Sequence, residues 1–580
     1  MPVPGSRPGT LGTGTSRLPV RTCGFRLSLR LSNVAGMTGQ RTVPTTDGPN
    51  RAERCTVAAE QALLAGRPHR ALGFLAAAGG AAAPPALRGR AELVRGLAQL
   101  RDGPVGDAHA SLLLAAALLA ADAPEKSARA ALAAANAAWA AGDRAACLKV
   151  LACEAFGSDT TAALSSAGAG EPQLREPYDP VRDHALGMRA VLEARFDEAG
   201  PPLRRVVEHA RTGEKPEGLL RSAAAALLLG DPAAARRAGA RALAAARNRG
   251  AVALVPQALE YLAYAELRAG RHAQARTHAG QGLRAALRAG QRNTAAHHHA
   301  VLALAASIEG DTTAVAGHVT AALTTARRHG LAQAATLAQW AAARADLGRG
   351  RPLDAADRLG PLVHPGPRRG HFAVWMLAVP CYVEAAVLAG CPDDTRTVVE
   401  EFALWAAFGA DPHAPAQLAR CRALLAAPDE ADALHRRALA LHDEAGGDFE
   451  RARTELLYGK WLRRRRRLRE ARDRLGAALV GFDRCGARVW AQQAGAELRA
   501  NGTASCPTGT DALSRLTPQQ LRIARHVAEG ATNREVAQRL AVSTRTVDYH
   551  LRNVFAVLGL RSRVELARMV EQTEPTGARP

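Results

Sequence analysis

The stretch AELRAGRHAQA, residues 265–275, decides the fold that we expect for most of this chain. Helix-forming residues run up to Gly270, and a second helix-forming run begins directly after it. Glycine at that point can adopt the left-handed conformation that ends a helix. The stretch ADLGRGRPLDA, residues 345–355, has the same design around Gly350. Each stretch therefore predicts two helices joined by a tight glycine turn.

Glycines of this kind recur at a fixed interval. Five of them lie 40 residues apart, namely Gly230, Gly270, Gly310, Gly350 and Gly390. Similar spacing is found nearer the N-terminus for Gly66, Gly103 and Gly142. A period near 40 residues made of two helices is typical of an α-solenoid, in which each pair buries its apolar face only against its neighbours. We therefore expect an all-α, TPR-like α-solenoid of helical hairpins over residues 55–505, with roughly eleven pairs.

The composition agrees with a long helical protein. At 580 residues the chain exceeds one hydrophobic core, and its 47% hydrophobic but only 4% aromatic residues favour helices over sheets. The formal charge of +22 suggests an anionic partner such as nucleic acid. Only four of the 76 basic residues are lysines, so this charge also reflects a general arginine bias. The longest apolar runs, such as residues 112–121, are about half of the roughly 20 residues that span a bilayer, and no membrane contact is expected.

Metal, cofactor and catalytic sites are not expected. The nine cysteines are scattered without a C-x-x-C pair, which is typical of free thiols in a reducing cytosol. Consecutive helical residues point in different directions, so His297, His298 and His299 are interpreted as surface histidines rather than metal ligands. G-x-S-x-G, H-E-x-x-H and strand-linked G-x-G-x-x-G motifs are missing from the sequence. We therefore predict that the protein is not an enzyme and holds no cofactor or metal.

The repeat pattern has distinct flanking segments. Residues 1–54 are rich in glycine, proline and arginine and are predicted to be a disordered extension, with Met37 as an alternative start. Residues 168–183 contain three prolines, interrupt the repeat rhythm and are interpreted as a joint. A linker at 506–512 is expected before a domain at 513–572. A disordered tail is expected at 573–580.

The domain at residues 513–572 contains four successive helix starts. Thr517 and Thr532 each precede a Gln or Glu by three residues, as in a capping box. Ser543 can cap a third helix, and Ser562 begins a fourth with another capping box. The connection between the second and third helices is very short. This arrangement indicates a helix-turn-helix motif.

The third helix of this domain has two distinct faces. Its apolar residues repeat at helical spacing and predict a core stripe of Val547, Leu551, Val554 and Leu558. The opposite face carries Arg545, Asp548, Tyr549 and Arg552. In a major groove, arginine can address guanine edges or phosphates, and aspartate can accept from a cytosine amino group. The pattern therefore predicts a DNA-contacting helix.

These residues resemble the LuxR-type helix-turn-helix family. The matching string is Leu516-Thr517-Pro518, Gly530, Asn533-Arg534-Glu535-Val536-Ala537, Leu540, Ser543, Thr546-Val547, His550 and Leu558-Gly559. The resemblance implies a four-helix domain whose third helix enters the major groove, while the fourth often supports dimerisation on a two-fold related site. The sequence departs from the family at Gln520, where Glu is usual, and at Val557, where Lys is usual. The second departure removes an expected phosphate contact.

The resemblance also implies which residues contact DNA. The base contacts implied by position are Asp548, Tyr549 and Arg552. The implied backbone contacts are Thr544, Thr546 and His550. The expected DNA-binding set is completed by Asn533, Arg534 and Arg545.

The preceding region looks like the closing repeats of the large ATP-binding LuxR-type regulators, at residues 449–459, 461–464 and 486–490. Members of that group normally carry an ATPase domain with a G-x-x-x-x-G-K-[ST] loop before the repeats. None of the four lysines here lies in such a motif, so ATP binding is not expected. The five arginines at 463–467 are interpreted as an exposed helical face with ion pairs between repeats, rather than as a DNA contact.

Together these features predict a bacterial, cytoplasmic transcription regulator, an activator rather than a repressor, that binds double-stranded promoter DNA as a homodimer. The repeat region is expected to receive a small-molecule or protein signal, with RNA polymerase or another protein as a candidate partner. The alternative is a helical-repeat interaction scaffold that has kept a weak DNA-binding module. Sequence preference in DNA binding distinguishes the two hypotheses.

Overall fold

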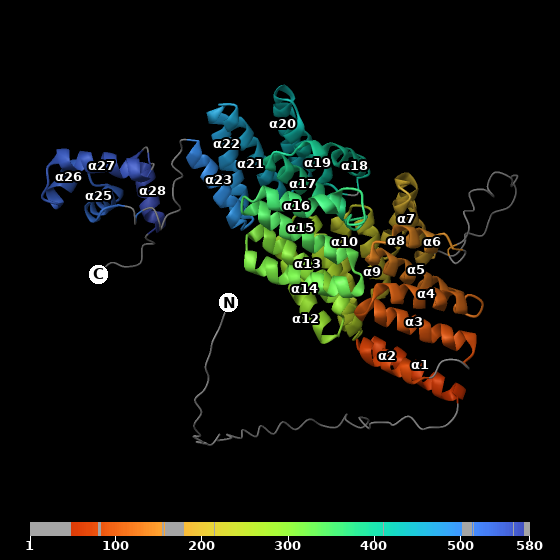
Figure 1. The fold of residues 1–580 in the computed structure, drawn as a ribbon. Helices are drawn as coiled ribbons and strands as arrows, with labels where there is room; N and C mark the ends of the chain where they lie inside the picture. The colour runs from red at the N-terminus through yellow and green to blue at the C-terminus, as the bar shows by residue number, and fades with distance from the viewer. Residues whose placement is uncertain are drawn as a thin grey trace, which may run out of the picture. The chain divides into compact units, whose positions relative to one another are not determined.

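The computed structural model describes residues 48–78, 83–153, 156, 179–213, 215–409, 411–501, 513, 516–558, 560 and 562–573. Within these residues the regular structure is entirely helical, with no β-strand. Figure 1 shows the helices of the repeat region packed side by side in order along the chain. The expected fold class, an all-α TPR-like solenoid followed by a helix-turn-helix domain, is confirmed.

The described part of the repeat region contains 23 α-helices, in agreement with about eleven pairs. The first twelve are α1 (Gly48–Leu64), α2 (Pro68–Ala77), α3 (Pro85–Asp102), α4 (Val105–Leu119), α5 (Pro124–Ala141), α6 (Arg144–Leu151), α7 (Pro180–Leu192), α8 (Phe196–His209), α9 (Pro216–Leu228), α10 (Pro232–Asn248), α11 (Val255–Arg268) and α12 (His272–Arg288). The others are α13 (Arg292–Glu309), α14 (Thr312–His329), α15 (Ala332–Gly348), α16 (Pro352–Val363), α17 (Trp375–Ala389), α18 (Arg396–Ala407), α19 (Ala414–Leu425), α20 (Pro428–Ala445), α21 (Asp448–Arg464), α22 (Leu468–Arg484) and α23 (Arg488–Ala500). Two 3-10 helices precede α11 and α18, namely η3 (Val252–Leu254) and η4 (Asp393–Thr395).

The turns between helices use glycine as the spacing predicts. The five glycines that lie 40 residues apart all have a positive φ, between 71° and 85°. Glycines halfway between them, such as Gly250 and Gly290, also have a positive φ, of 64° and 61°. From α9 to α15 a glycine therefore follows every helix, not every second one. At Gly270 the turn is closed by the Arg271 amide, which donates to the Glu266 carbonyl at 2.8 Å.

The first helix starts before the predicted boundary of the repeat region. α1 begins at Gly48, and Ala52, Cys55 and Ala59 are buried on one of its faces. α1 packs against α2 and α3, so apolar burial outweighs the polar composition that predicted disorder up to residue 54. Outside the described residues lie the rest of the predicted extension, most of the joint, the linker and most of the tail, that is residues 1–47, 168–178, 506–512 and 574–580.

Helices far apart in the sequence also pack against each other, which corrects the expectation that each pair contacts only its neighbours. α3 packs against α13, α5 against α15, and α23 against both α13 and α15. The Asn293 side-chain amide donates to the Gly103 carbonyl at 2.9 Å, and the Trp490 indole donates to the Ser307 carbonyl at 3.4 Å. Successive hairpins of a solenoid are rotated by a small angle, and this rotation accumulates until distant hairpins meet.

The largest apolar core of the described residues is built by helices α13 to α19 and α21 to α23. Its large aromatic side chains are Trp340, Trp375, Tyr382, Phe402, Phe449, Phe482 and Trp490. The core nearer the N-terminus is rich in alanine and leucine, as in the cluster around Leu112 and Ala135. All seven cysteines in the described part of the chain are free thiols. In the same part of the chain, no helix is both long and apolar enough to cross a bilayer.

The three consecutive histidines of α13 are not surface residues, contrary to the prediction. His298 is fully buried, and its Nε2–H donates to the Pro256 carbonyl at 3.1 Å, while His297 and His299 are half-buried. α13 packs against helices on several sides, among them α3, α11, α12, α14 and α15, so three successive positions all meet other helices. Within the described residues, no cluster of His, Cys, Asp and Glu is arranged to hold a metal ion.

The arginine run at residues 463–467 forms ion pairs between repeats, as predicted. Arg463 of α21 pairs with Glu497 of α23 at 2.8 Å, and Arg467 pairs with Asp432 of α20 at 2.7 Å. The arginines between them are exposed.

The C-terminal domain has four helices: α25 (Pro518–Ala528), α26 (Asn533–Arg539), α27 (Thr544–Leu558) and α28 (Arg563–Thr573). Its buried apolar residues form a cluster that runs from Leu513 to Val570 and contains no residue of the repeat region. The domain therefore has a hydrophobic core of its own.

Candidate nucleic-acid interface

Capping bonds begin the helices of the C-terminal domain where the sequence predicts. The Gln520 amide donates to Thr517 Oγ1 at 3.3 Å, and Gln520 Oε1 accepts from the Thr517 amide at 2.9 Å. The same reciprocal pair joins Thr532 and Glu535, at 3.3 and 2.7 Å. Hydrogen bonds from Thr532 hold the pKa of Glu535 below its ordinary value. Gln520 therefore completes a capping box in place of the usual Glu.

The turn between α26 and α27 has a backbone conformation that the sequence does not predict. Ala541 has a φ of 52°, in the left-handed region that non-glycine residues seldom adopt. The Val542 amide donates to the Ala537 carbonyl at 3.0 Å, and the Thr546 amide donates to Ser543 Oγ at 3.1 Å. These bonds end α26 and start α27 within four residues. The connection is thus as short as a helix-turn-helix motif requires.

The two faces of α27 are as predicted. The four residues of the core stripe are all buried, namely Val547, Leu551, Val554 and Leu558. On the other face Arg545 and Arg552 are exposed, Asp548 is half-buried, and Tyr549 is 62% exposed. Val557, where the family has Lys, packs against the domain core instead.

Asn533 and Asp548 lie together and join three helices. The Asn533 side-chain amide donates to Asp548 Oδ1, which links α26 to α27. Asn533 Oδ1 accepts from Arg563 Nη1 at 3.0 Å, and Arg563 Nη2 donates to the Ala531 carbonyl at 2.6 Å. Arg563 at the start of α28 thus supports the exposed surface, although the sequence singled it out only as part of a capping box. Its tertiary role has no local sequence signal.

The remaining candidate residues differ in their exposure to solvent and in whether other residues of the protein bind them. Arg534, Arg545 and Arg552 are exposed, and no described residue forms an ion pair or hydrogen bond with their guanidiniums. Thr544 is exposed, while Thr546 and His550 are half-buried. The free cations come from α26 and α27 and produce a positive surface. Such a surface attracts an anionic partner.

Comparison with known proteins agrees with this geometry. Residues 514–570 match the family of bacterial regulatory proteins, luxR family. An HTH-type transcriptional regulator of Mycobacterium tuberculosis is 53% identical over 51 residues, which is 9% of this chain and 6% of that protein. The Fimbriae Z protein of Escherichia coli is 36% identical over 61 residues, which is 10% of this chain and 29% of that protein. The chain therefore covers only a small part of these relatives.

Likenesses to solved structures are distant. The Rap protein complexed with competence and sporulation factor has 10% identity and a TM-score of 0.38, over 65% of this chain and 97% of that one. Yeast Tom70 has 13% identity and a TM-score of 0.30, over 90% of this chain and 99% of that one. The description of the repeat region therefore stands on its own helices and turns. The capping boxes, the faces of α27 and the family match agree that the C-terminal part of the chain, residues 514–570, is a LuxR-family helix-turn-helix domain.

Proposed function

We propose that this chain is a cytoplasmic, sequence-specific transcription regulator that activates promoters by placing α27 in the major groove of double-stranded DNA. The observation that carries this proposal is the set of unpaired, exposed arginines on α26 and α27 of a LuxR-family domain, Arg534, Arg545 and Arg552. Permanently charged guanidiniums at such positions suit guanine edges and phosphates. The role proposed is regulatory, without catalysis.

The geometry supports base contacts for some of the candidate residues and phosphate contacts for the others. Arg545, Tyr549 and Arg552 are free to reach base edges from the exposed face of α27. Asp548 is held by Asn533, which leaves its second carboxylate oxygen to accept from a cytosine amino group. In the proposal, backbone phosphates are contacted by Arg534, Thr544, Thr546 and His550.

The rest of the proposal concerns assembly. Two copies of the domain bind a two-fold related site, and half-site spacing follows from the dimer. The repeat region receives a small-molecule or protein signal and contacts RNA polymerase or another protein partner. A stack of helical hairpins supports this role because it presents a long surface to partners.

The test is DNA binding by the full-length protein. A preferred site is first selected from random double-stranded DNA, and affinity for it and for scrambled DNA is then measured by fluorescence anisotropy at several salt concentrations. We expect a clear preference, and affinity that falls steeply with salt. Equal binding to all sequences would support the alternative of a scaffold with a weak DNA-binding module.

Arg552→Ala tests the base contact directly. We expect it to weaken binding to the preferred site by about 1–3 kcal/mol, roughly ten- to a hundredfold, with a smaller loss on scrambled DNA. The matched control is Arg288→Ala, which removes the same charge from an exposed position of α12. A uniform loss on all sequences would instead assign Arg552 to a phosphate.

A further inference from the structure

A cavity of about 80 Å³ lies in the large core of the repeat region. Residues of α11, α13, α15, α17, α19 and α21 contribute to its wall, including Trp340, Arg344, Leu377, Cys381, Phe449 and Arg453. A single water needs roughly 10–15 Å³ of such space. The cavity therefore has room for about six water-sized groups. Its wall is mostly apolar, with a few charged side chains that converge on it.

Arg344 is the unusual residue of this wall. Its side chain is buried, with the residue only 4% exposed, and no described residue forms a hydrogen bond or an ion pair with it. Its guanidinium carbon lies 4.3 Å from the centroid of the Trp340 ring and 5.9 Å from that of Phe449. These cation–π contacts offset only part of the desolvation of a buried charge. The Nε of Arg344 is buried without a partner.

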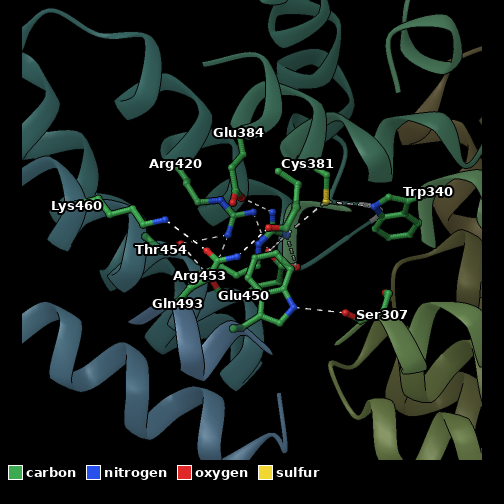
Figure 2. A network of polar contacts seen from close by, with 12 residues as sticks. Ser307, Trp340, Cys381, Glu384, Arg420, Glu450, Arg453, Thr454, Lys460 and Gln493 are labelled. Atoms are coloured by element: carbon green, nitrogen blue, oxygen red, sulfur yellow. Dashed lines mark hydrogen bonds and ion pairs between the residues drawn. The ribbon is translucent and has the colours of Figure 1, made fainter. Parts of the chain in front are cut away.

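The neighbouring charges are already paired with one another. Figure 2 shows Arg453 between Glu384 and Glu450, to both of which it donates. Arg420 donates to Glu450 Oε2 at 2.8 Å and to Thr454 at 3.3 Å. Burial by itself raises the pKa of Glu450, but the charges of Arg453, Arg420 and Arg344 outweigh it and hold this pKa well below its ordinary value. Each of the two carboxylates thus already has an arginine partner other than Arg344.

The second ion pair at the cavity also leaves Arg344 without a carboxylate partner. Arg268 pairs with Asp411 at 3.1 Å, and both line the cavity. The guanidiniums of the cluster are therefore four, Arg268, Arg344, Arg420 and Arg453, against three carboxylates, Asp411, Glu384 and Glu450. The excess positive charge is that of Arg344. Two further nitrogens at the cavity are buried without a partner, His413 Nδ1 and Arg453 Nε.

We propose that this cavity binds a small organic carboxylate, whose charged group pairs with Arg344 and whose apolar part lies against Trp340 and Phe449. An oxyanion would supply the missing countercharge and accept hydrogen bonds that no protein group accepts. An apolar body of a few carbon atoms suits the rest of the wall. The inference rests on the proposed function only in that the repeat region would receive the signal.

The test is calorimetric titration of the full-length protein, without DNA, in a chloride-free buffer. The probes are propionate and butyrate, with propionamide and butyramide as uncharged counterparts and inorganic phosphate as an oxyanion that has no apolar part. We expect one carboxylate to bind at one site per chain, at least tenfold more tightly than its amide. Arg344→Met should weaken that binding at least tenfold, and Arg344→Lys should weaken it less.

Folding is monitored separately by the Tm of each variant. Because no described residue forms a hydrogen bond or an ion pair with Arg344, Arg344→Met is expected to melt no lower than the wild-type protein in the absence of ligand. Arg288→Met, an exposed site of α12, is the control and should leave binding unchanged. Binding of neither carboxylate, equal binding of the amides, or retained affinity in Arg344→Met would overturn the proposal. Binding of phosphate alone would contradict the proposal that the ligand is an organic carboxylate. Since no DNA is present, each of these outcomes leaves the DNA-binding proposal untouched.

Discussion

At the scale of single residues, the His298 side chain fills the space beside Gly282 that a larger side chain at position 282 would need. A Cβ added to Gly282 of α12 would lie 2.0 Å from His298 Cε1 and 2.2 Å from its Nε2. The histidine is fully buried and donates to the Pro256 carbonyl of α11. The imidazole therefore sits where α12 and α13 meet, and it satisfies a backbone oxygen there.

We expect Gly282→Ala to destabilise the protein by about 1–3 kcal/mol, because the new methyl group displaces a ring that cannot move without losing its hydrogen bond. Gly280→Ala in the same helix is the matched control, since its Cβ would meet only Arg284 Nη1 at 3.8 Å. That change should be neutral or stabilising by up to about 1 kcal/mol. Urea unfolding followed by circular dichroism measures both. Equal effects of the two substitutions would contradict this account of the contact.

At the scale of elements, the glycine turns differ in what surrounds them. Gly350 has a φ of 71° and open space where a Cβ would lie. Gly310 has a φ of 85°, and its Cβ would lie 2.3 Å from Cγ2 of Val489 in α23. The same turn residue is thus needed for backbone conformation at one site. At the other it is also needed for a contact with a distant helix.

We expect Gly350→Ala to cost about 1–2 kcal/mol of unfolding free energy, from the left-handed backbone alone. Gly310→Ala should cost more, because the methyl group also collides with Val489. Urea titration of the two variants measures these losses. The double variant Gly310→Ala/Val489→Ala then separates the cost of the left-handed backbone from the cost of the collision. The double variant should recover part of the difference, and no recovery would remove Val489 from the explanation.

At the scale of the whole molecule, histidines are buried in an uncharged form at many helix contacts. Burial lowers the pKa of His298, His371 and His435 to about 4, and that of His184 and His442 to about 3, from 6.5. The unfolded chain binds protons at these sites below pH 6.5, whereas the folded chain does not. The stability that these groups contribute is therefore complete above pH 6.5. It is lost as the pH falls towards 4.

We accordingly expect a Tm that is nearly constant from pH 8 to 7 and falls steadily between about pH 6.5 and 4. Each buried histidine contributes up to about 1.4 kcal/mol of lost stability per pH unit. His298→Gln should make the slope shallower in this window. Loss of the Glu450 charge acts only at lower pH, because its pKa is held well below the ordinary value. A Tm independent of pH between 6.5 and 4.5 would show that these histidines are not buried in uncharged form.

The sequence by itself determined the helices and many of their ends. Capping boxes at Thr517 and Thr532, the core stripe of α27, and the glycine spacing depend on residues within a few positions of one another, and the structure confirms them. Among the nine candidate DNA contacts, Arg545, Asp548, Tyr549 and Arg552 follow from the helical spacing of α27. The other five rest on the resemblance to the LuxR-type family, and the roles of all nine stay predictions. Local interactions of this kind can be predicted from the sequence because their partners lie three or four residues apart.

Only the tertiary structure decided which distant helices meet and which polar groups they bury. The contact of α13 with α3 and α23, the burial of His298, and the unpaired charge of Arg344 depend on the rotation that accumulates over many hairpins. The tie from Arg563 through Asn533 to Asp548 likewise joins residues up to 30 positions apart. No local pattern specifies such pairings, because small rotations at each turn add up to the final position of every helix.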